Sequence, residues 1–283
     1  MTTGEVRTMH VQELSTTDLI PCLTLAADRE WPYEDRKWEF LLDVGQGYGI
    51  VDQSGDLVAS TILTTSGDLA AISMVLVATK YARQGLGTRV VRHAVAQAGE
   101  ATVHLHATST GRPLYERLGF RSLTEVDART GVLKAGPSRR TTVADQGDLA
   151  AILAFDAATF GVDRSNVLSG LFDFADRVRV VERDGELVGY ASSWRPGTKM
   201  QSTILGPVIA VDPADARALI ADLAADANGP IRVDIDNKHP ELGQWLAEHG
   251  LEPVFRCDLM TLGGRPLPGD RQAIHAPFMQ ALG

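Results

Sequence analysis

With 283 residues, the chain exceeds one typical domain and is long enough to bury two sizeable cores. Its composition is 44% hydrophobic and 22% charged, without an apolar run of membrane-spanning length, which is typical of a globular protein and argues against a membrane partner. The formal net charge of -9 argues against nucleic acid as the main partner, because phosphate binding needs clustered lysines and arginines.

The beginning of the chain alternates between strand and helix patterns. Its first seven residues lack the basic and apolar pattern of a signal region, so we expect a cytoplasmic protein. The predicted elements are, in order, a strand over 6–14, amphipathic helices over 16–29 and 33–43, a hairpin over 47–64, and an apolar strand over 71–77. A helix then follows with one apolar face, made by Val90, Val91, Ala94, Val95 and Ala98.

Gly85 and Gly87 stand between that apolar strand and that helix. A strand, a Gly-x-Gly turn and a helix N-terminus can form an anion cradle, because the free amides of the first turn point outward and the helix dipole favours negative charge. Glycines also let the backbone approach a ligand closely. On its own, the same turn is equally consistent with a tight connection, so the downstream sequence has to decide.

The downstream sequence contains a strand pattern over 103–107 and then a short helix that Gly119 is placed to end. Together with the strand ending at Val77 and the loop over 83–87, the run Leu-Tyr-Glu-Arg-Leu-Gly-Phe over 114–120 resembles the GNAT superfamily of acyl-CoA-dependent N-acyltransferases. The sequence departs from that family at Ala82, where members usually carry Gln or Arg, so one side-chain contact to phosphate is absent.

The second half of the chain repeats this order of elements. The pattern breaks around 134–138, which predicts one domain over 1–135 and another over 136–283. The expected fold class is α/β, with two tandem GNAT-like domains, each a mixed and mostly antiparallel sheet flanked by helices. The predicted elements are a strand over 140–143, helices over 149–160 and 166–174, strands over 178–183, 187–194 and 203–211, a helix over 214–225, a strand over 231–236, a helix over 240–249 and a last strand over 254–261.

The two copies differ where the cofactor would bind. In the second half, Asp212 is a natural N-cap and Pro213 a natural first helical residue, so a carboxylate occupies the helix end that would otherwise hold pyrophosphate. Asp215 is expected to add repulsion there. Leu246 stands at the position equivalent to Tyr115. We therefore predict that the second half is catalytically silent and that it covers the first half or lines the substrate site.

The resemblance implies direct attack of a substrate amine on the thioester of acetyl-CoA, with no metal ion. It implies that the motif strand pairs with the pantetheine through its backbone and supplies an oxyanion donor, and that the loop amides bind pyrophosphate. It also implies that Tyr115 protonates the leaving thiolate, although ring packing at a helix–sheet junction is the alternative role. The cofactor-binding residues expected by this resemblance are Met74, Val75, Leu76, Val77, Arg83, Gln84, Gly85, Leu86, Gly87, Thr88, Thr108 and Arg112.

The general base is left open by the sequence. Many family members carry a glutamate on the motif strand, and residues 71–74 contain none. His104 and His106 share one face of the following strand and titrate near neutral pH, so either can relay a proton through water. Strand histidines also serve purely structural roles, and a His-x-His pair without further ligands is a weak metal site.

Candidate substrate contacts come from both halves. In this fold the segment between the first two helices borders the acceptor pocket, which nominates Trp31, Tyr33 and Glu34. Asp234 and Asp236 share a strand face and offer negative charge to a cationic group. The alternatives are core packing for Trp31 and simple solvation for the two aspartates.

We therefore predict an acetyl-CoA-dependent N-acetyltransferase, acting as a monomer or homodimer on a primary amine of a small molecule or peptide. Its single cofactor site lies in the first half of the chain. One alternative is a non-catalytic protein that binds or senses acyl-CoA. Another is transfer to oxygen, or transfer of a longer acyl chain.

Overall fold

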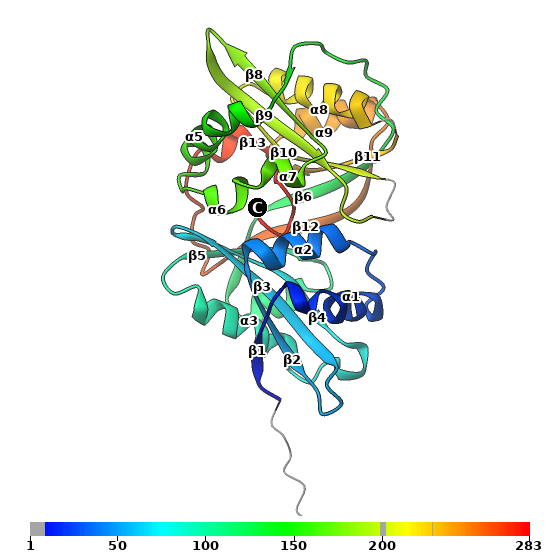
Figure 1. The fold of residues 1–283 in the computed structure, drawn as a ribbon, viewed down its shortest axis with the longest axis vertical. Helices are drawn as coiled ribbons and strands as arrows, with labels where there is room; N and C mark the ends of the chain where they lie inside the picture. Colours follow the sequence, from blue (N-terminus) through cyan, green and yellow to red (C-terminus); the bar gives the residue numbers. More distant parts are fainter. Residues whose placement is uncertain (1–8, 199–201, 228) are drawn as a thin grey trace, which may run out of the picture.

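The computed structural model describes residues 9–198, 202–227 and 229–283 (Figure 1). Its strands form one 13-stranded sheet in the order β1-β2-β3-β4-β5-β12-β6-β11-β10-β9-β8-β7, with β13 paired to β10. The sheet is mostly antiparallel, and helices flank it in each half of the chain. This arrangement confirms the predicted α/β class.

The first half contains the elements that the sequence predicts up to the short helix ended by Gly119, and then a strand, β6, that the sequence analysis does not predict. Residues 6–8 of the expected first strand lie outside the described residues. The observed elements are β1 (Val11–Leu14), η1 (Thr16–Asp18), α1 (Leu19–Asp28), α2 (Asp35–Val44), β2 (Gln46–Val51), β3 (Leu57–Ser66), β4 (Leu69–Val77), η2 (Thr79–Tyr81), α3 (Leu86–Gln97), β5 (Thr102–Thr108), α4 (Arg112–Arg117) and β6 (Phe120–Gly131).

The second half differs from the prediction in two places. The helix expected over 166–174 is two short helices, because the chain turns at Gly170 between them. The strand expected to be the last is followed by another, β13. The observed elements are β7 (Thr142–Val143), η3 (Gln146–Asp148), α5 (Leu149–Phe160), α6 (Ser165–Leu168), α7 (Leu171–Phe174), β8 (Arg177–Arg183), β9 (Glu186–Trp194), β10 (Thr203–Ala210), α8 (Pro213–Ala227), β11 (Ile231–Asp236), α9 (Pro240–Glu248), β12 (Glu252–Leu262), η4 (Arg271–Ala273) and β13 (Ile274–Ala276).

Both halves open their first helix with the same capping box. The Ser15 side chain accepts from a backbone amide of the first turn, and the Asp18 carboxylate accepts from the Ser15 amide at 2.9 Å. Asp145 and Asp148 repeat this pair, with the Asp148 carboxylate 2.8 Å from the Asp145 amide. Because such a box satisfies free amides at a helix start, its repetition marks the same structural position in each copy.

The two halves exchange their long final strands. β12 lies between β5 and β6, where Cys257 is the register partner of Thr108. β6 in turn lies between β12 and β11, where Asp127 is the register partner of Ile235. Each half therefore depends on a strand from the other to complete its sheet. The domain boundary near residue 135 stays a prediction. β12 comes after that boundary in the sequence and pairs with strands that come before it.

A shared aromatic core joins the halves. Phe40 of α2 packs on Phe174 of α7 with ring centroids 4.3 Å apart, and Phe278 contacts both rings. Trp194 at the end of β9 completes the group. Because these rings come from both halves, burying them stabilises the arrangement of the halves as well as each half.

Candidate active site

Strands β4 and β5 run side by side only where they begin. Their parallel pairing covers Leu69–Ala71 and Thr102–His104. Beyond that point the strands diverge, and a cavity of about 610 Å³ lies between them. Its walls include β4 from Ile72 to Val77, together with His106 and Thr108 of β5. An opening between parallel strands exposes backbone groups that a ligand can pair with, as an added strand would.

A β-bulge in β4 directs this divergence. The register with β3 shifts so that Ser60 faces Leu76 while Ile62 faces Ser73. Met74 adopts a left-handed conformation with φ of 50°, and the Ser60 hydroxyl donates to its carbonyl at 2.9 Å. Bulges bend a strand and re-aim its backbone groups, and they often lie next to active sites.

The glycine-rich loop leads from this cavity to the start of α3. Gly85 is the N-cap of α3 with φ of 82°, a conformation that favours glycine, and a second cavity of about 390 Å³ lies over it. Arg83 and Arg117 add positive charge to its lining. The two cavities share Val77, Arg83, Gly87 and Leu114, so they form one groove from the helix N-terminus into the opened sheet.

Most of the predicted cofactor residues are brought together in this groove. All twelve line one of the two cavities except Gln84 and Arg112. The Gln84 side chain donates to the Lys80 carbonyl at 3.2 Å. Arg112 forms ion pairs with Glu116 at 2.7 Å and with Asp258 at 3.0 Å. The free first-turn amides, the helix dipole and the absent Cβ of Gly87, which would lie 3.3 Å from Leu114, fit a phosphate-bearing ligand.

Tyr115 lines the large cavity from α4 and is 8% exposed. Its ring lies edge-on to Phe120, with centroids 6.0 Å apart, and a Cβ on Gly111 would come within 3.0 Å of it. Burial raises the pKa of the hydroxyl above its usual value. The phenol is therefore protonated at neutral pH and can donate a proton into the cavity.

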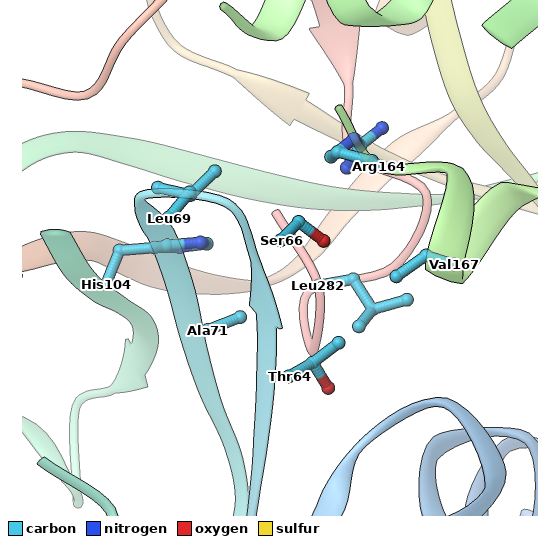
Figure 2. Close-up of a pocket in the computed structure, with 8 residues that line it drawn as sticks. All are labelled: Thr64, Ser66, Leu69, Ala71, His104, Arg164, Val167 and Leu282. Carbon is cyan, nitrogen blue, oxygen red and sulfur yellow. The ribbon is translucent and has the colours of Figure 1, made fainter. Parts of the chain in front are cut away.

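The structure separates the two histidines that the sequence treats as equivalent. His104 is 2% exposed. Figure 2 shows its side chain among the residues that line a small pocket, which include Ser66, Leu69 and Arg164. That pocket has a volume of only about 10 Å³. Among the described residues, neither of its ring nitrogens has a hydrogen-bond partner. Burial holds its pKa well below the usual range, with the neighbouring His106 acting in the same direction. His104 is absent from the lining of the large cavity.

His106, by contrast, lines the large cavity. Its Nδ1 lies 2.8 Å from the main-chain carbonyl oxygen of Gln280. Burial lowers the pKa of His106, and the Gln280 carbonyl and the Asp234 carboxylate partly offset that effect. The ring is therefore mostly neutral at pH 7 and can accept a proton.

The predicted substrate residues fall into three groups. Trp31 lines the large cavity. Glu34 and Asp234, from opposite halves, line one small pocket of about 40 Å³. Tyr33, 42% exposed, and Asp236 line neither space.

The carboxylates of Glu34, Asp234 and Asp236 already form ion pairs with basic side chains of the same chain. Glu34 pairs with Lys37, and Asp234 pairs with Arg232 through two hydrogen bonds of 2.8 and 2.9 Å. Asp236 pairs with Lys238 at 3.1 Å and accepts from the Thr124 hydroxyl at 2.8 Å. Neighbouring basic side chains therefore pair with both Asp234 and Asp236, and their role in binding a cationic substrate stays a prediction.

Sequence reasoning missed the contribution of residues 277–283. Met279, Gln280 and Ala281 line the small pocket, and Leu282 covers His104. This segment follows the last strand and carries neither a helical nor a strand period. Only its position in the folded chain brings it to the site.

The equivalent opening in the second half is filled by the protein itself. β10 and β11 pair in parallel over Thr203–Leu205 and Ile231–Val233, and β10 then shifts register. At that point β13 pairs with β10, with Val208 opposite Ala276 and Ile209 opposite Ile274. A strand of the chain thus occupies the place where β4 and β5 enclose a cavity.

The helix end beside this filled opening is also occupied. The Asp212 carboxylate accepts from the Ala214 amide at 2.8 Å, as the sequence predicts. The expectation for Asp215 is wrong, because that side chain is buried and pairs with Arg140 at 3.2 Å and Arg183 at 2.7 Å. Asp215 therefore faces two guanidinium groups of its own chain, which offset its charge.

Comparison with known proteins agrees with this geometry. A family model described as "Acetyltransferase (GNAT) family" matches residues 13–120, and one described as "Acetyltransferase (GNAT) domain" matches residues 152–276. The protein named "Uncharacterized N-acetyltransferase YitH" of Bacillus subtilis is 33% identical over 269 residues, which are 92% of this chain and 94% of that protein. The chain belongs to the GNAT superfamily. This GNAT protein is thus an acyltransferase of the N-acetyltransferase family.

Two solved structures share the fold over both halves. A Pyrococcus horikoshii protein assigned to the acetyltransferases has a TM-score of 0.82 at 18% identity, covering 98% of this chain and 96% of that one. A tandem GNAT protein from the clavulanic acid biosynthesis pathway has a TM-score of 0.61 at 13% identity, covering 92% of this chain and 100% of that one. At these identities the likeness concerns the fold, which is that of a tandem GNAT protein.

Among the described residues, neither a membrane-spanning helix nor a metal-binding cluster of side chains is found. In that part of this GNAT chain, no helix is both long and apolar enough to cross a membrane. There, too, no three His, Cys, Asp or Glu side chains are grouped so that they can hold a metal ion.

Proposed function

We propose that this GNAT protein transfers an acetyl group from acetyl-CoA to a primary amine of a small molecule or peptide, in the first half of the chain. The observation that carries the proposal is the groove that runs from the N-terminus of α3 into the opening between β4 and β5. The second half has a strand in the equivalent place. The predictions of a cytoplasmic location and of a monomer or homodimer remain part of this proposal.

The residues of the groove have separate tasks. Amides of residues 83–88 bind pyrophosphate, supported by the guanidinium groups of Arg83 and Arg117. The backbone of Met74–Val77 pairs with the pantetheine, and an amide at the bulge stabilises the oxyanion. Acetyl-CoA supplies the thioester carbon that the amine nitrogen attacks as the carbon–sulfur bond breaks.

Tyr115 acts as the general acid that protonates the leaving sulfur. Its position on the cavity wall and its protonated state support this role. Replacing Tyr115 with Phe keeps the ring packing on Phe120 but removes the proton. We expect Tyr115→Phe to lower kcat about 100-fold with little change in the affinity for acetyl-CoA. Unchanged turnover would show that the tyrosine only packs.

His106 is the base that we assign, since it lines the cavity and His104 does not. An alkyl amine is mostly protonated at neutral pH, so a proton acceptor is needed before it attacks. A neutral imidazole beside the cavity meets that need, directly or through one water.

The acceptor approaches from the side of Trp31 and the small pocket lined by Glu34 and Asp234. Both signs of charge are present there, with Lys37 and Arg232 beside the carboxylates. This lining suits an amine that carries further polar groups better than an apolar one.

A screen of amines, with detection of the released thiol, tests the proposal. Amino acids, polyamines, aminoglycosides and peptides are each mixed with the protein and acetyl-CoA, and Tyr115→Phe serves as the matched control. Thiol release that depends on the amine and is lost in the variant supports the proposal. If acetyl-CoA binds and no amine releases thiol, the protein is a binding or sensing protein instead.

A further inference from the structure

Residues 277–283 connect the filled opening of the second half with the open one of the first. The segment directly follows β13, which pairs with β10. It then runs between the halves, and the end of the chain lies between α2 and the α6–α7 region (Figure 1). Its residues contact both histidines of β5, with Gln280 at His106 and Gly283 beside His104.

The segment is held firmly by the core that joins the halves. The ring of Phe278 is fully buried among Phe40, Phe174 and Trp194. The Trp194 indole donates to the Phe278 carbonyl at 3.2 Å. The amide of Leu282 donates to the Met279 carbonyl, which closes a turn around Gln280. The Gln280 carbonyl is therefore a fixed group and not part of a loose tail.

The contact between Gln280 and His106 dictates which ring nitrogen carries the proton. A main-chain carbonyl only accepts hydrogen bonds, so at 2.8 Å the His106 Nδ1 must be the protonated nitrogen. In a neutral imidazole the other nitrogen, Nε2, then holds the lone pair. Because His106 lines the large cavity, that lone pair is the one available to an acceptor amine.

We propose that Gln280 is a positioning residue, whose main-chain carbonyl holds His106 in the Nδ1–H tautomer and so keeps Nε2 ready to accept the proton of the amine. The inference rests on the proposed function, since it concerns the same site. It also assigns a task to the second half, where β13 pairs with β10 at the equivalent opening. That half delivers the Gln280 carbonyl to the active site of the first.

Several charged groups face His106 and bear on its titration. Asp234 and Asp236 of β11 raise its pKa, and Arg271 of η4 lowers it. Burial is the largest influence and lowers the pKa below the usual value. The tautomer at neutral pH therefore follows from the geometry of the hydrogen bond, because the ring is already uncharged.

Nitrogen NMR of the full chain labelled with 15N-histidine tests the tautomer without relying on activity. The His106 signals are assigned by their loss in His106→Asn. His249 is the matched reference, since its Nδ1 lies 2.7 Å from the Trp245 carbonyl, away from the groove. We expect a protonated Nδ1 and an unprotonated Nε2 for His106 at pH 7.5, and His249 supplies the reference signal of an Nδ1 bonded to a main-chain carbonyl. A protonated Nε2 on His106, or averaging between tautomers, overturns the proposal even if the protein is active.

Two substitutions of His106 then separate positioning from proton transfer. Asn places an amide near the position of Nδ1 and can still donate to the Gln280 carbonyl, whereas Gln reaches toward the Nε2 position. We expect both variants to lose kcat about 100-fold, together with the acidic limb of the pH profile. His106→Asn keeps the thermal stability of the wild type more closely than His106→Gln does, and His249→Asn keeps full turnover.

The outcomes distinguish this inference from the proposed function. If no amine is acetylated by the wild type, the proposed function fails, and the NMR result still decides whether Gln280 fixes the ring. If amines are acetylated and His106→Asn retains wild-type kcat and pH profile, the positioning proposal fails while the acetyltransferase remains. Equal stability of the Asn and Gln variants also counts against the hydrogen bond.

Discussion

The openings at β4–β5 and β10–β11 occupy equivalent places in the two halves, but the first holds a cavity and the second holds a strand. The first encloses a cavity of about 610 Å³ that continues to the start of α3. The second is closed by β13, which adds to β10 as a strand. The same opening between parallel strands is thus left as a cavity in one half and filled by a strand of the chain itself in the other.

β13 can fill the second opening because a peptide strand forms hydrogen bonds with the same backbone groups as a ligand that pairs by strand addition. Ile274 and Ala276 are buried, so β13 also supplies apolar packing. At the start of α8, the Asp212 carboxylate accepts a hydrogen bond from the free Ala214 amide of the first helical turn. The second opening therefore needs no cofactor to be stable.

The largest expected effect concerns the exchange of β6 and β12. A fragment of residues 1–135 lacks β12, so β5 and β6 lose the strand that joins them. We expect this fragment to show no cooperative unfolding transition by circular dichroism. Co-expression with residues 136–283 restores the transition. A separately folded fragment that binds acetyl-CoA would mean that the halves are independent in spite of the exchange.

Emptying the second opening is expected to destabilise the fold without creating a cofactor site. Ile274→Ala removes a buried side chain from β13 and lowers the free energy of unfolding by about 2–5 kcal/mol. Denaturant titration measures the loss, and calorimetry counts the acetyl-CoA bound per chain. We expect one equivalent in both proteins. A second equivalent in the variant would identify β13 as a plug over a competent site.

Negative charge at the two helix ends sharpens the comparison further. Gly85→Glu is expected to weaken acetyl-CoA binding about 100-fold, roughly 2.7 kcal/mol, because the carboxylate competes with pyrophosphate for the α3 amides. Gly85→Asn is the control, since Asn tolerates the left-handed conformation. Ala214→Glu, at an exposed site on α8, leaves binding unchanged. Thermal shift with acetyl-CoA reads out all three, and weaker binding in Ala214→Glu contradicts the single-site assignment.

The smallest expected effect concerns His104. Burial lowers its pKa, so below about pH 6.5 the unfolded chain binds more protons at His104 than the folded chain does. The free energy of unfolding therefore falls as pH falls below that value. His104→Leu removes this dependence, so the variant loses less stability than the wild type between about pH 6.5 and 5. Unfolding at several pH values measures it. We expect the turnover of His104→Leu to be unchanged. A drop in kcat would make His104 a candidate general base again.

The predictions from sequence succeeded where short-range patterns decide the outcome. Glycine placement, helix caps and apolar periods located most of the helices and strands but not β6 or β13, and the structure brings the predicted loop and Tyr115 to one groove. They failed for Asp215, which was expected to repel an anion at the helix end and is instead buried and paired with two arginines. Its partners lie on distant segments, and a local pattern carries no information about them.

The amino-acid sequence by itself determined the repeated plan of this GNAT protein, the glycine turn that opens α3 at Gly85 and the carboxylate cap of Asp212 on α8, because turns, caps and periodicity act within a few residues. Only the tertiary structure decided that His106 and not His104 borders the groove, that β13 fills the second opening, and that Gln280 reaches the first. Those outcomes depend on burial and on strand pairing between segments far apart in the chain, and such pairing is settled only when the whole core packs.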